Sequence, residues 1–242
     1  AGNNIGLRAG ARAAPDGYTL VMGETSNLAV NPYLYKSLDF SAVDDLVPVA
    51  LMGSGPLVLV VRTGSRFDSL ASIIQAGKKS DLFYASSGSG TVGHLVAESL
   101  RDATGIKLQH IPYKGAGPAM NDLLGGQVDL YFASLTASLP QIAAGKIRPL
   151  AVSSEKRHVA LPQVATLAEL GFPSLTYTAF YGVVAPARTP EGGLDLLNKQ
   201  INSALDTDEV RAVFAKQGIT PQLTSRTQFA SFLAAERAKW SA

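Results

Sequence analysis

Short apolar runs alternate with segments of helical spacing along this chain. Residues 57–61 read Leu-Val-Leu-Val-Val and are apolar at every position, which is typical of a strand buried on both faces. The apolar run at 82–85 is followed by residues 92–100, whose apolar positions recur as on one face of a helix. Because strands alternate with helices throughout, the pattern predicts an α/β fold with mostly parallel sheets.

The same patterns place the remaining elements. Further strands are expected at residues 18–22, 46–50, 106–111, 128–132, 150–152 and 177–185. Helices are expected at residues 5–13, 70–76, 91–101 and 139–144, and behind Pro118, Thr166, Thr189 and Ser225. Asp68 or Ser69 is expected to cap one helix, and Thr166 with Glu169 has the spacing of a capping box.

The length of 242 residues suits one large domain or two small ones. No flexible linker and no internal repeat divides the chain. If two domains exist, continuous strands must therefore cross between them, and the long apolar runs near 57–66 and 176–186 are the candidates.

Residues 84–94, which read YASSGSGTVGH, carry the strongest functional signal. A strand, a loop of small residues and a helix follow one another there. The first N–H groups of a helix have no partner within it, and the helix dipole is positive at that end, so such a junction attracts anions. The expected anion-binding residues are Ser86, Ser87, Gly88, Ser89, Gly90 and Thr91.

Gly88, Gly90 and Gly93 also spell GxGxxG, the fingerprint of dinucleotide-binding turns. No Asp or Glu closes the following strand, which disfavours NAD, whereas Lys114 offers a partner for the phosphate of NADP. An NADP-dependent oxidoreductase is therefore the alternative function. A tight strand–helix turn that binds nothing would give the same pattern.

Two other strand ends carry candidate ligand-binding residues. Tyr113 and Lys114 follow the strand at 106–111 and offer a hydroxyl and further amides, although a plain connecting loop is an equal alternative. Ser26 and Asn27 lie beyond the strand at 18–22, where open α/β sheets bind ligands, although a helix cap explains them too.

Composition and motifs favour a binding protein over an enzyme. The net charge is +2 and the basic residues are scattered, which disfavours nucleic-acid binding. The sequence has no run of 18 apolar residues, so we expect no membrane-spanning helix. The absence of cysteine excludes disulfides and thiolate metal sites. The three histidines lack metal-binding spacing, and no nucleophile elbow or acid pair stands out. We expect no catalytic residues, no metal and no cofactor.

Several motifs occur in an order that points to a known family. They lie at residues 14–20, 30–35, 84–94, 111–115, 122–129, 150–152 with 161–162, and 185–186 with 189–190. Together they cover almost the whole chain. The chain resembles the Bug-type extracytoplasmic solute receptors of tripartite tricarboxylate transporters.

The resemblance implies two Rossmann-like domains joined by crossing strands, as in type II periplasmic binding proteins. Domain one would comprise residues 1–63 and 178–242, and domain two residues 64–177. A small carboxylate, which is a dicarboxylate, a tricarboxylate or an acidic amino acid, would be captured in the cleft by hinge closure and passed to a membrane permease. The protein would be periplasmic.

The resemblance also implies which residues hold the carboxylate, mostly through backbone amides and water. Domain two would contribute residues 86–91 together with Phe132, Ala133 and Ser134 after the next strand. Domain one would contribute Ser26 and Asn27.

The family begins with a strand, a glycine-rich loop and a helix ahead of the segment that matches residues 1–6. We therefore expect a chain that is processed, with its signal peptide removed, or truncated at its N-terminus; the alternative is a protein that has lost ligand binding. A truncated chain would bind its carboxylate poorly, and the sheet edge that the absent strand would cover favours dimerisation or aggregation.

Overall fold

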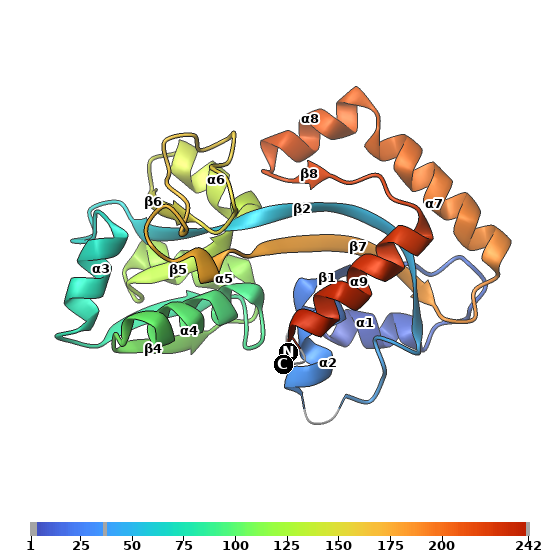
Figure 1. The fold of residues 1–242 in the computed structure, drawn as a ribbon, viewed down its shortest axis with the longest axis horizontal. Helices are drawn as coiled ribbons and strands as arrows, with labels where there is room; N and C mark the ends of the chain where they lie inside the picture. The colour runs from blue at the N-terminus through green and yellow to red at the C-terminus, as the bar shows by residue number, and fades with distance from the viewer. Residues whose placement is uncertain (1–3, 36–37, 241–242) are drawn as a thin grey trace. The chain divides into compact units, whose positions relative to one another are not determined.

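The structure is a computed structural model, and it describes residues 4–35 and 38–240 (Figure 1). The chain divides into two compact units: unit 1 comprises residues 1–54, 180–214 and 220–242, and unit 2 residues 55–179 and 215–219. These divisions fall at other positions than the boundaries expected from the sequence, and residues 215–219 were expected in domain one. Residues 1–3, 36–37 and 241–242 of that expected domain lie outside the described residues.

Two long strands carry the chain between the units. The chain leaves unit 1 within β2 (Leu46–Arg62) and returns within β7 (Thr178–Pro186). The sequence pattern predicted two separate strands in place of β2, because small residues and Pro56 interrupt its apolar runs. The strand continues through them because Gly53 and Ser54 pair with β8 (Thr220–Pro221) before Pro56, and Leu57 pairs with Ser134 directly after it.

Unit 2 contains a sheet with a parallel centre. β3 (Leu82–Ser86) lies between β4 (Leu108–Pro112) and β5 (Leu130–Ser134) and is parallel to both. β2 pairs antiparallel with β5 and with β6 (Ile147–Val152). The expectation of mostly parallel sheets is therefore wrong outside β3–β5, because β2 enters from unit 1 rather than through a strand–helix–strand crossover.

Each helix of unit 2 follows a strand along the chain. They are α3 (Leu70–Gly77), α4 (Val92–Thr104), α5 (Ala116–Gly125) and α6 (Leu135–Ala143), with a 3₁₀ turn at Pro173–Leu175. Of the two caps expected for α3, Asp68 or Ser69, the structure has Ser69, which forms a reciprocal capping box with Ser72. Buried side chains fill two clusters, one containing Tyr84, Val96 and Phe132. The other contains Ala85, Met120 and Ala133.

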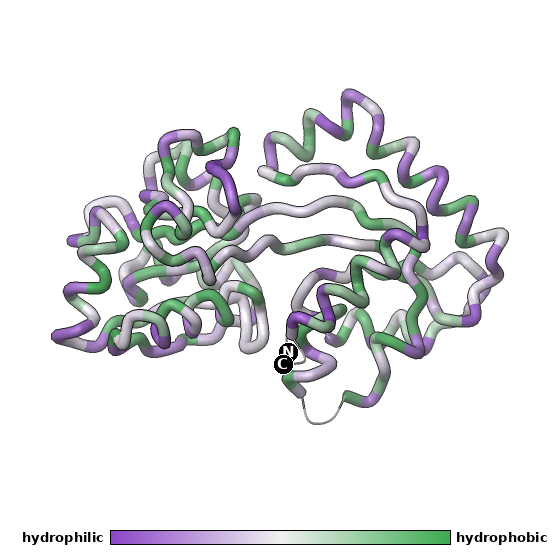
Figure 2. Tube along the Cα trace, viewed as in Figure 1, coloured by the Kyte–Doolittle hydropathy of each residue, from purple (hydrophilic) through white to green (hydrophobic). Residues whose placement is uncertain are grey.

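Unit 1 has its own strands and helices. They are α1 (Asn4–Ala11), β1 (Val21–Glu24), a π-helical turn (Ser26–Val30), α2 (Asn31–Leu34), α7 (Glu191–Leu205), α8 (Asp208–Lys216) and α9 (Arg226–Trp240), with parts of β2 and β7. β1 pairs antiparallel with β7. Leu7, Leu28, Phe180 and Phe229 belong to its core. Figure 2 shows hydrophobic and hydrophilic residues alternating along α7, as an amphipathic surface helix requires.

Some expected elements differ from the structure. Thr166 and Glu169 exchange the two hydrogen bonds of a capping box, yet turns rather than an α-helix follow them. α6 begins at Leu135 rather than at residue 139, directly behind β5. α8 was not expected, and it has no buried residue to give a clear apolar stripe. No helix in the described parts of the chain is long and apolar enough to cross a bilayer.

Candidate functional site

The carboxyl ends of β3, β4 and β5 bring together the candidate residues of unit 2. Ser86 ends β3 and pairs in register with Pro112 at the end of β4, and Ser134 ends the parallel strand β5. The loop at 86–91 and the pair Tyr113 and Lys114 therefore leave the sheet at one edge. Open α/β sheets bind their ligands at such an edge.

The segment at residues 86–91, called here the binding loop, is closed by its own hydrogen bonds. The buried hydroxyl of Ser86 accepts from Gly88 N at 3.1 Å. The carbonyl of Gly88 accepts from Thr91 Oγ1 at 2.8 Å and from Thr91 N at 3.2 Å. Gly88 has φ 143° and Gly90 has φ 80°, values that favour glycine. The glycines are thus required by the shape of the loop.

Backbone hydrogen bonds join the binding loop to the loop behind β4. Tyr113 N donates to Ser86 O at 3.0 Å, and Gly115 N donates to Ser87 O at 3.1 Å. The helices α4 and α5 begin directly behind these two loops, and neither N-cap residue, Thr91 or Gly115, makes a side-chain capping bond. Two helix N-termini without a side-chain cap therefore start side by side, where the dipoles of both favour an anion.

The three candidate ligand-binding residues in β5, Phe132, Ala133 and Ser134, are engaged in packing or helix capping. Phe132 and Ala133 lie within β5 rather than after a strand, and both are buried in the core. The sequence prediction ended this strand too early, because residues 133 and 134 are small and carry little strand signal. Ser134 caps α6, since its hydroxyl accepts from Ala137 N at 3.3 Å.

Tyr113 and Lys114 differ in their surroundings. The hydroxyl of Tyr113 donates to Asp122 Oδ2 at 2.7 Å. Burial, and then this hydrogen bond to a carboxylate, raises the pKa of Tyr113 to about 12. Lys114 is exposed. The tyrosine is therefore a neutral, anchored group, and the lysine is an exposed surface charge.

Ser26 and Asn27 belong to unit 1 and lie in the π-helical turn that follows β1. Both are buried, and the side-chain oxygen of Asn27 accepts from Glu24 N at 2.8 Å. The sequence left two alternatives for these residues, a ligand-binding strand end and a helix cap. In the structure Asn27 instead fixes the turn, and a part for these two residues in ligand binding stays a prediction.

Two histidines that the sequence reasoning set aside support the binding loop. His94 Nδ1 accepts from Gly90 N at 3.3 Å. His110 Nε2 lies 2.6 Å from the Ser86 hydroxyl. The two imidazoles stack with centroids 4.2 Å apart, and Tyr84 stacks on His110 at 4.9 Å. The pairing of Tyr84 with His110 across β3 and β4 could have indicated this cluster. That pairing can be recognised only when the register of the two strands is known.

The electrostatics of this histidine pair keep both rings neutral at neutral pH. Burial lowers the pKa of His94. Burial, and then the neighbouring His94, lowers the pKa of His110 to about 4. The Tyr84 hydroxyl donates to Glu98 Oε1 at 2.6 Å, and burial together with this bond raises the Tyr84 pKa.

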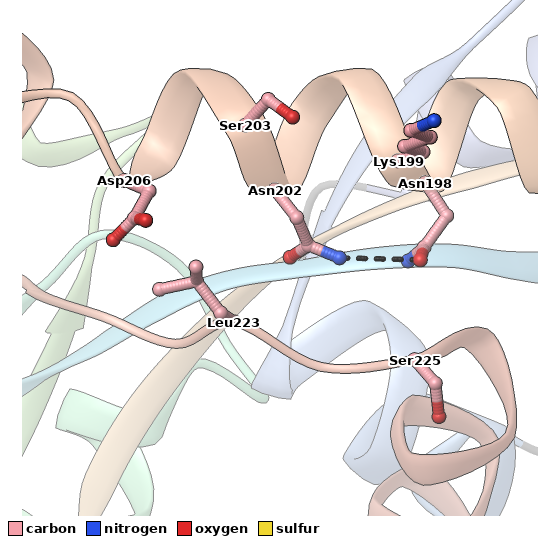
Figure 3. A pocket seen from close by; sticks show the side chains of 7 residues that line it. All are labelled: Asn198, Lys199, Asn202, Ser203, Asp206, Leu223 and Ser225. Carbon is pink, nitrogen blue, oxygen red and sulfur yellow. Dashed lines mark hydrogen bonds between the residues drawn. The ribbon is translucent and has the colours of Figure 1, made fainter.

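A separate groove of about 440 Å³ lies in unit 1, between α7 and the segment before α9 (Figure 3). Its lining residues are Asn198, Lys199, Asn202, Ser203, Asp206, Leu223 and Ser225. Asn198 Nδ2 donates to Val49 O at 2.7 Å, and Asn202 Nδ2 donates to Thr224 O at 2.9 Å. These amides tether backbone segments, and no residue predicted to bind ligand lines the groove.

Known proteins resemble the chain over its full length. Protein BugT of Bordetella pertussis is 39% identical over 244 residues, which span 100% of this chain and 75% of that protein. The R. palustris protein Rpa4515, solved with adipate, has a TM-score of 0.94 and 32% identity over 98% of this chain and 80% of its own. MatC from Rhodopseudomonas palustris, solved with bound malate, has a TM-score of 0.93 and 28% identity over 100% of this chain and 84% of its own.

These likenesses confirm the α/β fold of a periplasmic binding protein and the resemblance found in the sequence motifs. The family model described as tripartite tricarboxylate transporter family receptor matches residues 1–242. The chain belongs to the tripartite tricarboxylate transporter receptor family.

Proposed function

We propose that this chain is a periplasmic solute receptor, not an enzyme, that captures a small carboxylate and delivers it to the membrane permease of a tripartite transporter. Membership of the receptor family supports this function over an NADP-dependent oxidoreductase. The observation that carries the proposal is the pair of helix N-termini, α4 and α5, that begin without side-chain caps at one sheet edge.

The proposed contacts are backbone amides of the first turns of α4 and α5. The amides of Gly88, Gly90 and Thr91 already donate to protein atoms at 3.1–3.3 Å. In an α-helix the first amides have no partner within the helix, so those behind Thr91 and Gly115 are the donors that a carboxylate needs. The binding loop then serves to place α4 rather than to supply every donor.

Among the expected ligand classes, we favour a dicarboxylate. Two solved relatives hold adipate and malate, and each of these molecules carries two carboxylates. One carboxylate at the edge of the unit 2 sheet would use the two helix N-termini. Tyr113 is neutral and Lys114 is an exposed cation, so neither residue repels a carboxylate at this edge.

The proposal is tested by isothermal titration calorimetry with malate, adipate, citrate, glutamate and NADPH at pH 7.5. Binding of malate or adipate with no heat from NADPH is the expected result. Saturable binding of NADPH without any carboxylate would reject the receptor function.

A matched pair of variants locates the site. Gly117 is the second residue of α5 and Gly192 the second residue of α7, and a side chain added at either would meet no atom within 4 Å. Gly117→Glu places a carboxylate where the ligand is proposed to bind, and we expect at least about tenfold weaker binding. Gly192→Glu is the control and should bind as the wild type does. Equal affinities in the two variants would exclude the α5 terminus as the site.

A further inference from the structure

The binding loop is held by an acceptor that exists only on a neutral histidine. His94 Nδ1 accepts from Gly90 N at 3.3 Å, so this nitrogen presents its lone pair to the amide. Protonation of His94 fills that lone pair and turns the two groups into a pair of donors. The hydrogen bond cannot survive this change. Gly90, with φ 80°, lies in the turn that leads into α4.

The second histidine contact behaves differently. The Ser86 hydroxyl accepts from Gly88 N at 3.1 Å and lies 2.6 Å from His110 Nε2. A hydroxyl oxygen has two acceptor sites, so it can accept from both Gly88 N and a protonated His110. The contact at Ser86 therefore persists in either charge state of His110. Only the contact of His94 with Gly90 is strictly dependent on a neutral ring.

The groups around the two imidazoles restrict where a proton can go. Tyr84 lies on the β3 side of His110, and His94 stacks on His110 at 4.2 Å, so two charged rings would repel each other. On α4, Glu98 favours a charged His94, whereas Arg101 opposes it. Glu98 is already engaged, since it accepts from Tyr84 and forms an ion pair with Arg101.

The elements packed beside this cluster add few free charges. On α5, Asp122 accepts a hydrogen bond from Tyr113. Ser99 on α4 contacts the hydroxyl of Tyr177 at 3.5 Å. Lys114, behind β4, is exposed to solvent. The histidine pair therefore responds to pH mainly through its own burial and through Glu98 and Arg101.

We propose that His94 is a positioning residue of the carboxylate site: its neutral imidazole holds the Gly90 amide, and its protonation releases the binding loop and weakens ligand binding as the pH falls. This inference rests on the proposed function, because it assumes that the loop places α4 for the ligand. The direction in which ligand affinity changes with pH distinguishes this role from direct contact with the ligand. A histidine that contacted the carboxylate would bind it more tightly when protonated, whereas a positioning histidine of this kind binds it less tightly.

The first experiment compares two substitutions of His94 by calorimetry with malate and adipate at pH 7.5. His94→Asn retains a side-chain oxygen that can accept from Gly90 N, and its affinity should stay within about threefold of the wild type. His94→Leu removes the acceptor and should bind at least about tenfold more weakly, since a buried amide then lacks its partner. Equal affinities for the Asn and Leu variants would overturn the inference.

His158 provides the matched control. Like His94, it accepts at Nδ1 from a backbone amide, here that of Ala160 at 3.2 Å. His158 lies outside both the binding loop and the cluster of His94 and His110. His158→Leu should leave the affinity and its pH dependence unchanged. A loss equal to that of His94→Leu would show a general effect of removing an imidazole.

The second experiment is the pH profile from 7.5 to 4.5. The ratio of the wild-type dissociation constant to that of His94→Asn cancels the titration of malate itself. We expect this ratio to rise at least about threefold toward low pH, because only the wild type loses its acceptor. A smaller change, or a ratio that falls, would overturn the inference.

Nuclear magnetic resonance separates failure of this inference from failure of the proposed function, because it needs no ligand. The ¹⁵N signal of His94 Nδ1 and the amide proton of Gly90 should titrate together in the wild-type protein. If none of the carboxylates binds at pH 7.5, the receptor function fails while this titration still decides the positioning role. A Gly90 amide that does not follow His94 would reject that role.

Discussion

Gly93 determines how closely α4 approaches β5, and Gly93→Ala tests that contact. Gly93 is the second residue of α4, and an added Cβ would lie 2.4 Å from the carbonyl oxygen of Phe132. Ordinary contacts begin at 3.4 Å, so the two backbones would have to separate by roughly that difference. Phe132 cannot shift freely, because it is paired with Leu59 in the β2–β5 ladder.

Two opposing effects set the size of the loss. Overpacking in a close-packed interior costs about 1–3 kcal/mol, and a contact with backbone belongs at the upper end. Replacing glycine by alanine within a helix stabilises the helix by at most about 1 kcal/mol. We therefore expect Gly93→Ala to lower the free energy of unfolding by about 2 kcal/mol, because the steric effect exceeds the helix preference.

The assay is chemical denaturation followed by circular dichroism, with Gly117→Ala as the control. Gly117 holds the same second position in α5, but an added Cβ there meets nothing within 4 Å. Gly117→Ala should leave the free energy of unfolding unchanged or raise it by up to about 1 kcal/mol. If both variants unfold within about 0.5 kcal/mol of the wild type, the argument from close approach is wrong.

Three further predictions concern the same unit. Ser87→Ala should cost at most about 0.5–1.5 kcal/mol of carboxylate binding in calorimetry, whereas Gly88→Val, at φ 143°, should cost far more; the reverse order would mean that side chains build the site. Ser69→Ala should lower the free energy of unfolding by about 1 kcal/mol without changing ligand affinity, since it removes only the cap of α3. The folded-state pKa of His110, about 4, lies below the ordinary value of 6.5, so the unfolded chain binds the proton more readily. The free energy of unfolding should therefore decrease as the pH falls from about 6.5 toward 4. A denaturation midpoint that does not change over this range would contradict the prediction.

Local patterns sufficed for the binding loop but not for its support. Residues 84–94 encode a strand, a glycine turn and a helix within a short stretch, so both the loop and the start of α4 could be predicted. The contact between His94 and His110 could not, because it requires β4 to lie beside β3 in one particular register. The histidines carried no metal-like spacing and were set aside for that reason.

Tertiary context also decided where some elements begin and end. β2 runs through Pro56 because β8 pairs with it before the proline and β5 pairs with it after the proline. β8 itself has only two residues and gives no sequence pattern. The capping box at Thr166 predicted a helix, although its two hydrogen bonds also close a turn. A short motif of this kind thus predicts its own hydrogen bonds but not the type or length of the secondary-structure element that follows it.

Residues 215–219 limit how this protein can be divided or recombined. They belong to unit 2 although both flanking segments belong to unit 1. Within unit 2, Gln217 O accepts from Thr136 Oγ1 at 2.8 Å, and Gly218 lies so close to Leu135 that a Cβ would come within 2.5 Å of its side chain. A gene fragment encoding residues 55–179 would therefore leave the start of α6 without its neighbour. Exchange of unit 2 between relatives would have to transfer two separate stretches of sequence, so a single crossover in each flanking strand would yield a mismatched chimera.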